Sequence, residues 1–254
     1  MQPAPILQDH LPADLKAAAA ARLPQMAPVK PGEWLNVDSA YRAQLAEKAR
    51  LIADRRSSVI ATLPQATDSV VELLGVVLAD LALRPGFTVA GDQVRRPDGV
   101  SIILDRQDPF LTLSRLVQED FCIHQSMGDE HALTAALLCF PAAWTLAEKL
   151  GRPLSAIHRP VARYDATIAH RVQRMFDMIA PGRPLWRANL LRYDDPALFQ
   201  PHTEAAPRPV GHTGSAYLRC ERQTIRRLPT SGAVVFTIHT TIVENPERSS
   251  APLR

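Results

Sequence analysis

The last third of the chain alternates its side chains along two extended segments, and this pattern constrains the fold more than any other sequence feature. Residues 216–228 predict one long strand, a turn follows at 229–232, and residues 233–240 predict a second strand. Successive side chains of a strand point to opposite faces of a sheet. The first strand is therefore predicted to divide its polar residues between two faces: Arg219, Glu221 and Gln223 on one, and Cys220, Arg222 and Arg226 on the other.

The rest of the chain mixes helical and extended patterns. One helix is predicted to follow Asp38, which is expected to be its N-cap. Other helices are predicted at 13–23, from 67 to just before Pro85, from 109 to about 120, at 141–151 and at 164–180. Strands are predicted within 87–104, at 133–140 and at 186–193. Strands interleaved unevenly with helices predict an α+β fold, with a mainly antiparallel sheet and flanking helices.

Length, composition and charge exclude several classes of protein. The chain has 254 residues, of which 46% are hydrophobic and 22% charged, and its formal net charge is +3. These values are typical of a globular protein. The sequence contains no lysine- and arginine-rich run, no phosphate-binding glycine loop, no CxxC pair and no apolar stretch of membrane-spanning length. We therefore expect a cytoplasmic protein that binds neither nucleic acid nor membranes.

His158 is the histidine whose surroundings carry most information. It lies between Gly151, which is expected to end a helix, and Pro160, which disfavours helix just before it. The sequence predicts a stiff loop that presents one imidazole, and such a loop suits an axial haem ligand. A histidine that bridges loops through hydrogen bonds explains the same pattern, so the residues leave both readings open.

Charged residues form two further candidate groups. Arg219, Arg222 and Arg226 on the predicted strand, with Arg187 beside Trp186, are suited to clamp haem propionates. A solvated charged face, or ion pairs with Glu221, explains them equally well. Where the helix opened by Pro109 is expected to end, Glu119 and Asp120 form an acid pair that could bind a cationic substrate or relay protons, or simply cap the next segment.

Several ordered segments resemble one known family. They are LVQED at 116–120, CFPAAW at 139–144, EKLGRP at 148–153, IHRPV at 157–161, WRAN at 186–189 and RCERQT at 219–224. Together they resemble the haem-dependent oxidative N-demethylase alpha-subunit-like family over roughly residues 28 to 240. The resemblance implies a PAS-like fold that binds haem b. It also implies oxidative demethylation of a small amine such as dimethylamine, with electrons from NADPH through separate reductase components that carry flavin and an iron–sulfur cluster.

The resemblance assigns roles to individual residues. His158 becomes the expected iron ligand; Arg187, Arg219 and Arg226 become cofactor-binding candidates; Glu119, Asp120 and Arg222 become catalytic candidates. The chain departs from the family pattern at Ala162, Leu190 and His239, the last standing where the pattern has an arginine. These departures leave the substrate less defined than the cofactor.

The sequence also suggests how the chain is divided. Residues 1–33 are rich in proline and alanine and are expected to form an N-terminal arm, residues 34–243 a single haem-binding domain, and residues 244–254 a disordered tail. Two other functions remain compatible with the same fold: a haem protein that senses gas or redox state without catalysis, and an interaction subunit that has lost haem.

Overall fold

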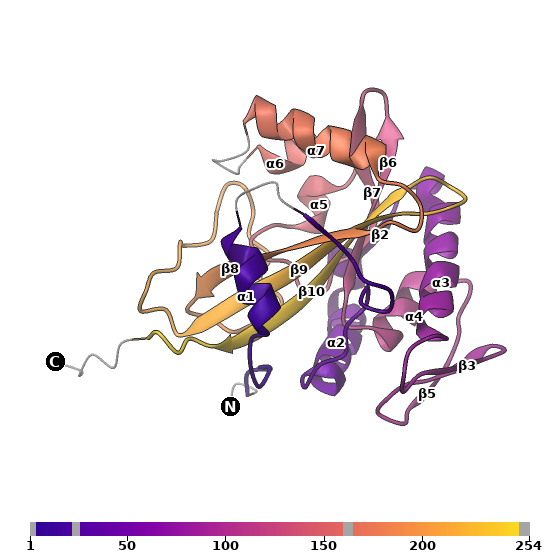
Figure 1. Cartoon of the computed structure of the whole chain (residues 1–254), viewed down its shortest axis with the longest axis horizontal. Coiled ribbons are helices and arrows are strands. Elements are labelled where there is room, and N and C mark those ends of the chain that lie inside the picture. The colour runs from indigo at the N-terminus through magenta and orange to yellow at the C-terminus, as the bar shows by residue number, and fades with distance from the viewer. Residues whose placement is uncertain (1–3, 22–25, 160–164, 249–254) are drawn as a thin grey trace.

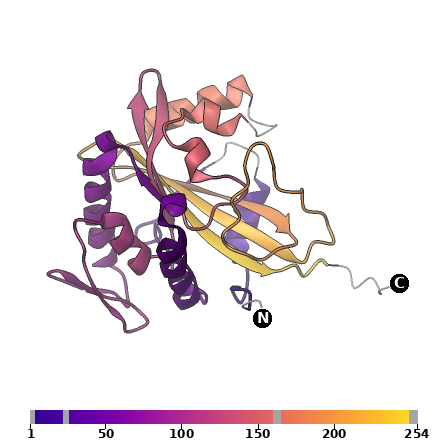
Figure 2. The same ribbon diagram turned by 180° about the vertical axis from the view of Figure 1, so that it is seen from behind.

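Within residues 4–21, 26–159 and 165–248, which the computed structural model describes, seven strands form one antiparallel sheet (Figure 1). Their order across the sheet is β1-β8-β9-β10-β6-β7-β2. The strands are β1 (Ala27–Pro28), β2 (Ile60–Thr62), β6 (Asp120–Met127), β7 (Glu130–Leu137), β8 (Leu185–Tyr193), β9 (Tyr217–Arg227) and β10 (Val234–Glu244). Seen from behind in Figure 2, the same long strands cross the centre of the molecule. The predicted α+β class with a mainly antiparallel sheet is confirmed.

The predicted C-terminal hairpin is confirmed as β9 and β10, which pair along their whole length. Arg222 lies opposite His239 and Cys220 opposite Thr241, whereas Glu221 lies opposite Thr240. The two predicted sets of residues therefore lie on opposite faces of the sheet. Strand β10 continues to Glu244, beyond the expected end at residue 240.

Helices cover both faces of the sheet. On one face, here called the α2 face, lie α1 (Ala13–Ala20), α2 (Tyr41–Val59), α3 (Thr67–Leu81) and α4 (Pro109–Leu116), with a short 3-10 turn at Pro64–Ala66. On the other, here called the α7 face, lie α5 (Leu146–Lys149), α6 (Leu154–His158) and α7 (Ala166–Met178). Figure 1 shows α6 and α7 together at the top of the molecule, well away from α2 and α4.

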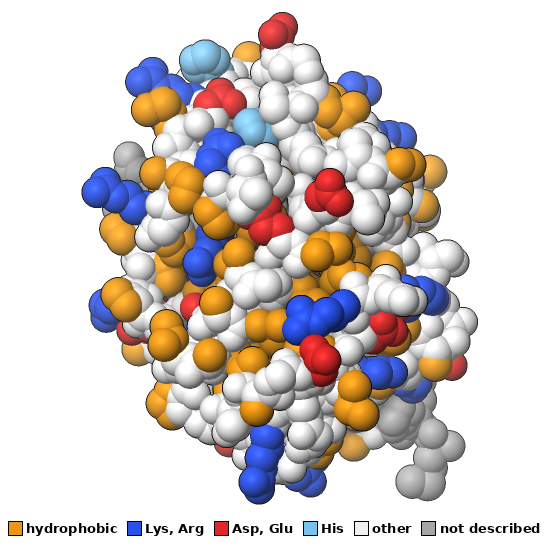
Figure 3. Space-filling model, turned by 90° about the vertical axis from the view of Figure 1, so that its right-hand side faces the viewer, with side chains coloured by type: hydrophobic (Ala, Val, Ile, Leu, Met, Phe, Trp, Pro, Cys, Tyr) orange, Lys and Arg blue, Asp and Glu red, His pale blue; other side chains and the backbone are white. Residues whose placement is uncertain are grey.

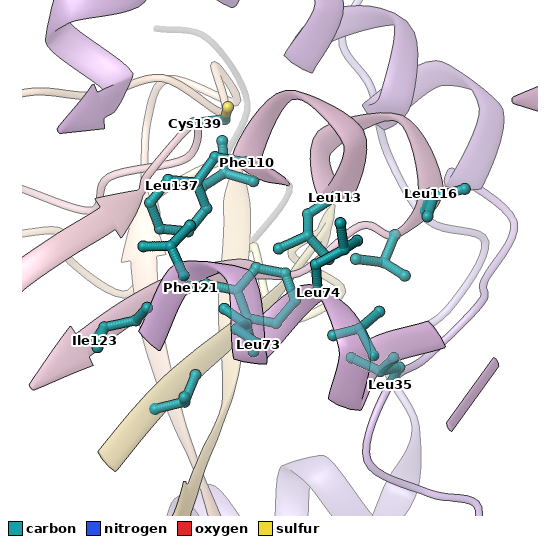
Figure 4. Close-up of a cluster of buried hydrophobic side chains, with 14 of the residues drawn as sticks. Leu35, Leu73, Leu74, Phe110, Leu113, Leu116, Phe121, Ile123, Leu137 and Cys139 are labelled. Atoms are coloured by element: carbon teal, nitrogen blue, oxygen red, sulfur yellow. The ribbon is translucent and has the colours of Figure 1, made fainter. Parts of the chain in front are cut away.

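The main core lies between the sheet and helices α2 to α4. Figure 4 shows Leu73 and Leu74 of α3 and Leu113 of α4 meeting Phe121 of β6 in this layer. Phe121 and Leu113 are both fully buried. Burying a side chain of this size contributes about 1.5–3 kcal/mol. The apolar spacing that predicted α3 and α4 thus arises from their shared contact with the α2 face.

A small second sheet packs against α3 and α4. Its strands are β3 (Thr88–Ala90), β4 (Gln93–Arg95) and β5 (Ser101–Ile103), in that order and antiparallel, as the turn-rich sequence predicted. Figure 3 views the molecule from this side, where Lys and Arg side chains alternate with acidic and apolar ones instead of gathering into one patch. No helix among the described residues is long and apolar enough to cross a membrane.

Two helices are shorter than the sequence predicted. The helix opened by Asp108 ends at Leu116, and Asp120 begins β6 instead of closing that helix. The helix expected from residue 141 is reduced to the single turn α5, which Thr145 caps through the backbone N–H of Glu148. Asp120 lies within the pairing of β6 with β10, which requires extended backbone where the helix was expected to end.

Within the described residues, the segments near both ends of the chain contact the sheet. Gln8 donates to the carbonyl oxygen of Thr240, and α1 places Leu15 against Ala188 and Cys220. The helix expected to reach residue 23 ends at Ala20, and residues 22–25 lie outside the described part. Asn245 is buried and donates to the carbonyl oxygen of Ser215. Of the tail expected at 244–254, residues 249–254 lie outside the described part.

Candidate functional site

His158 is the last residue of α6 and not part of the loop that the sequence predicted. Its Nδ1 lies 2.9 Å from the carbonyl oxygen of Leu154, one helical turn earlier. Burial lowers the pKa of His158, and the charges of Lys149 and Arg187 lower it further. The imidazole is therefore neutral at neutral pH, and an Nδ1–H bond to the backbone fixes Nε2 as the nitrogen that carries the lone pair. Pro160, expected to stiffen this segment, lies outside the described residues.

A second imidazole, which the sequence did not single out, faces the same region. His124 of β6 is buried, and its ring meets Phe176 of α7 edge to face at 5.4 Å. Burial, with the nearby ring of His158, lowers the pKa of His124 to about 3. Its Nδ1 is buried without a hydrogen-bond partner among the described residues. Recognising β6 as a strand would have placed His124 on this face, but the polar residues at both ends of β6 conceal its alternation.

The middle of the α7 face carries a group of polar side chains from β8 and β9. Glu221 is buried, and its Oε2 accepts from Asn189 Nδ2 at 3.2 Å and from Gln223 Nε2 at 3.1 Å. Arg187 is partly buried; burial lowers its pKa, and the charge of Glu221 opposes that effect. Arg187 also acts on the pKa of His158, so these charged groups influence one another across this face. We call His158, His124, Arg187 and Glu221 the α7-face site.

Arg219 lies on the same face but serves mainly as a structural link. It is 1% exposed and donates to the carbonyl oxygens of Leu198 and Phe140. Its Nε lies 3.6 Å from Oε1 of Glu221. A fully buried guanidinium that bonds backbone carbonyls in this way fixes two loops to β9.

Arg222 and Arg226 lie on the α2 face, so the sheet separates them from His158. Arg222 lies over the ring of Trp186 at 4.8 Å and donates to the carbonyl oxygen of Trp34. Arg226 lies over the ring of Trp34 at 4.3 Å. The structure thus brings Arg187 and Arg219 to the side of His158, and it does not bring Arg222 or Arg226 there.

Glu119 lies in a buried ion-pair network near the α2 face. Its Oε1 is 3.1 Å from Nδ1 of His239, whose Nε2 is 2.9 Å from Oδ2 of Asp38. Although burial opposes these shifts, the hydrogen bonds and charges lower the pKa values of both acids, that of Asp38 to about 2, and raise that of His239 to about 9. Glu119 therefore has a buried cation as its partner at neutral pH.

Asp120 is likewise paired inside the protein. It lies 3.0 Å from Nζ of Lys48, and both side chains are almost fully buried. Its Oδ2 also accepts from the backbone N–H of Phe140. Sequence reasoning placed Glu119 and Asp120 together at a helix end, whereas each has its own cationic partner.

Two surface hollows lie away from the α7-face site and offer no further candidate. One hollow lies beside β5 and α4 and is lined by residues that include Asp92 and Arg115. The other lies between Leu35 and Phe87. In the part of the chain that the structure describes, no three His, Cys, Asp or Glu side chains are grouped so that they could hold a metal ion.

Helix α7 is held over the site by Arg227, which donates to the carbonyl oxygens of Phe176, Asp177 and Ile179. These carbonyls belong to the last turn of α7 and the residue that follows it, where cations are favourable. Replacing Arg227 with methionine should lower the free energy of unfolding by about 1.5–3 kcal/mol, because hydrogen bonds from a charged donor are lost. Faster hydrogen–deuterium exchange in α7 would check this expectation, and Arg171→Met, on the exposed side of α7, is the matched control. Equal exchange in the two variants would contradict it.

The chain matches a family model described as haem-dependent oxidative N-demethylase, alpha subunit-like, over residues 25–252. Because the match covers most of its length, the chain belongs to this family.

Proposed function

We propose that the α7-face site binds haem b, with His158 as the axial iron ligand. The observation that carries the proposal is the state of His158: a partly buried imidazole, neutral at neutral pH, whose Nδ1 is oriented by the backbone of its own helix. Metal-binding histidines commonly use one ring nitrogen for such an orienting bond and the other for the metal. Membership of a family named for haem dependence supports the same assignment.

The chemistry of the neighbouring side chains fits this cofactor. Arg187 is a partly buried cation for which no hydrogen bond is described, and a propionate would pair with it. An apolar cluster that includes Cys122, Ile238, Trp144 and Phe236 borders the polar group and would contact the macrocycle. Arg219, fixed by two carbonyl oxygens, would contribute positive charge more than direct contact.

The proposed reaction is the oxidative N-demethylation of a small methylated amine of the dimethylamine type. The methyl carbon leaves as formaldehyde, which carries one oxygen atom of O2, and the other oxygen atom leaves as water. Methylamine remains, and NADPH provides the two electrons through a separate reductase with flavin and an iron–sulfur cluster. Haem, when bound, supplies the oxygen activation. The chain supplies the axial imidazole, the charges of Arg187 and Glu221, and the cover of α6 and α7, which limits the access of water.

The same proposal includes the organisation of the chain. Residues 34–243 would form one PAS-like haem domain located in the cytoplasm, with residues 1–33 as an arm against the sheet. The antiparallel sheet with helices α5 to α7 over one face supports a fold of this kind.

The test of haem binding is the absorption spectrum of the protein loaded with haemin. We expect a Soret band in the wild type, and His158→Ala should lose the haem or shift the band. His170→Ala, an exposed histidine of α7, is the matched control and should leave the spectrum unchanged. If His158→Ala kept the wild-type spectrum while His124→Ala lost it, the ligand would have to be reassigned to His124.

Catalysis needs a separate measurement. With a surrogate reductase, the haem-loaded protein should release formaldehyde from dimethylamine. A protein that binds haem but releases no formaldehyde across a broad panel of amines would instead be a non-catalytic haem protein, and the proposed reaction would be wrong.

A further inference from the structure

We propose that Glu221 and Thr240 form the site that receives the ammonium group of the substrate. The inference takes the class of substrate from the function proposed above, a small methylated amine, which is a cation at neutral pH. The position of the site rests only on the side chains of β9 and β10.

The other two acidic candidates already have buried cationic partners. Glu119 is paired with His239 and Asp120 with Lys48, so a ligand cation at either acid would lie next to a positive charge that is already buried there. Glu221 differs because the side chains that donate to its Oε2 are the neutral amides of Asn189 and Gln223. It is also the acid whose charge acts on Arg187, and hence belongs to the cluster around His158.

Glu221 retains capacity to accept hydrogen bonds. An ionised carboxylate offers about four lone-pair sites, and the two amides engage Oε2. The nearest cation to Oε1 is Arg219, whose Nε is 3.6 Å away, beyond hydrogen-bond distance, while its other nitrogens bond two backbone carbonyls. Oε1 is therefore the atom to which an ammonium N–H would donate.

Thr240 provides the second, independent observation. It is 1% exposed, and its Oγ1 is buried without a hydrogen-bond partner among the described residues. It lies directly opposite Glu221 in the β9–β10 pair, on the same face of the sheet. A buried hydroxyl without a partner costs about 1–3 kcal/mol. A cation with two N–H groups would donate to both Oε1 of Glu221 and Oγ1 of Thr240.

The apolar neighbours suit the methyl groups of such a cation. Ile238 lies opposite Gln223 in the same strand pair and packs with Cys122 in the apolar cluster of this face. Trp144 and Phe236 pack against that cluster. A carboxylate that shares its sheet face with aliphatic side chains such as Ile238 favours a methylated ammonium over a fully hydrated metal cation.

Direct binding tests the site without any turnover. Isothermal titration of dimethylammonium chloride, into haem-free and haem-loaded protein, should show saturable binding to the wild type. Glu221→Gln keeps the shape but removes the charge, and it should weaken binding by about tenfold to a hundredfold, the loss expected for a hydrogen bond between charged groups. Glu244→Gln, at the exposed end of β10, is the matched control and should bind as the wild type does.

A second variant keeps the inference testable if Glu221→Gln does not fold, which could happen because Glu221 lies next to the buried Arg219. Thr240→Val removes only the hydroxyl and should weaken binding by about fivefold, the effect of one neutral hydrogen bond. Wild-type affinity in folded Glu221→Gln or in Thr240→Val would overturn the inference, as would a wild type that does not bind dimethylammonium at all. Absence of a Soret band would count against the haem proposal alone, because the titration of haem-free protein reports on the cation site separately.

Discussion

Replacing His239 with alanine is expected to lower the free energy of unfolding by about 3–5 kcal/mol, the cost of leaving a buried charge without its partner. His239 is 4% exposed and lies between two carboxylates, 3.1 Å from Glu119 and 2.9 Å from Asp38. Without the imidazole, Glu119 stays buried and Asp38 half-buried, with no cation between them. Chemical denaturation measures the effect, and His170→Ala, at an exposed position, should change stability by less than about 0.5 kcal/mol.

The same network predicts how stability depends on pH. The pKa of His239 is raised to about 9 from the model-peptide value of 6.5, so the folded protein holds this proton more tightly than the unfolded chain. Its contribution is complete below pH 6.5 and is lost as the pH rises through about 9; the shift corresponds to about 3 kcal/mol. The pKa of Asp38 is lowered to about 2, so its contribution is present above pH 3.8 and lost as the pH falls through about 2.

Measured across this range, the difference in stability between wild type and His239→Ala should therefore shrink between neutral pH and about pH 9. A difference that stayed constant over that interval would show that His239 stabilises the protein through packing and not through its charge.

This network also bears on His239, where the resemblance noted in the sequence implies an arginine. The sequence alone suggests that a positive charge is lost there. Asp38 and Glu119 raise the pKa of the imidazole enough to keep it charged at neutral pH. The substitution thus preserves a cation at this position of β10, and the sequence could not reveal this because both acids come from distant segments of the chain.

The parts of the fold that could be predicted are those governed by local periodicity. Alternation along β9 assigned Glu221 and Arg222 to opposite faces, and the helical spacing of apolar residues located α3. Pro109 indicated the start of α4, and there Asp108 accepts from the backbone N–H of Leu111. Each of these features depends on residues a few positions apart, which is why the sequence displays them.

The candidate site could be predicted only in part, because strand order decides which residues meet. The sequence grouped Arg187, Arg219, Arg222 and Arg226 because all four are arginines. Neighbouring residues of β9 point to opposite faces of the sheet, so Arg219 and Arg222 lie on different faces. Nothing local indicates that β6 would pair with β10, and this pairing brings His124 to the α7 face. The polar ends of β6 concealed the strand, and with it the second imidazole.

The second large effect concerns Asp120 and Lys48, and here a double-mutant cycle is decisive. Asp120→Asn keeps an oxygen that can accept from the backbone N–H of Phe140 but leaves Lys48, 0% exposed at its side chain, without a counter-charge. The expected loss of stability is about 3–5 kcal/mol. Lys48→Met alone leaves Asp120 charged and buried, with a comparable loss. Combining the two removes both charges, so the double variant should be more stable than either single variant.

The cycle distinguishes a structural acid from a catalytic one. If the pair acts only in folding, the double variant, which has no carboxylate at position 120, should regain stability, bind dimethylammonium with wild-type affinity and show an unchanged Soret band. A catalytic Asp120 would instead give a stable double variant whose formaldehyde release is reduced by about a hundredfold or more, the usual contribution of a positioned acid or base. We expect the first outcome, since Lys48 lies 3.0 Å from Asp120 and this buried cation already neutralises the carboxylate.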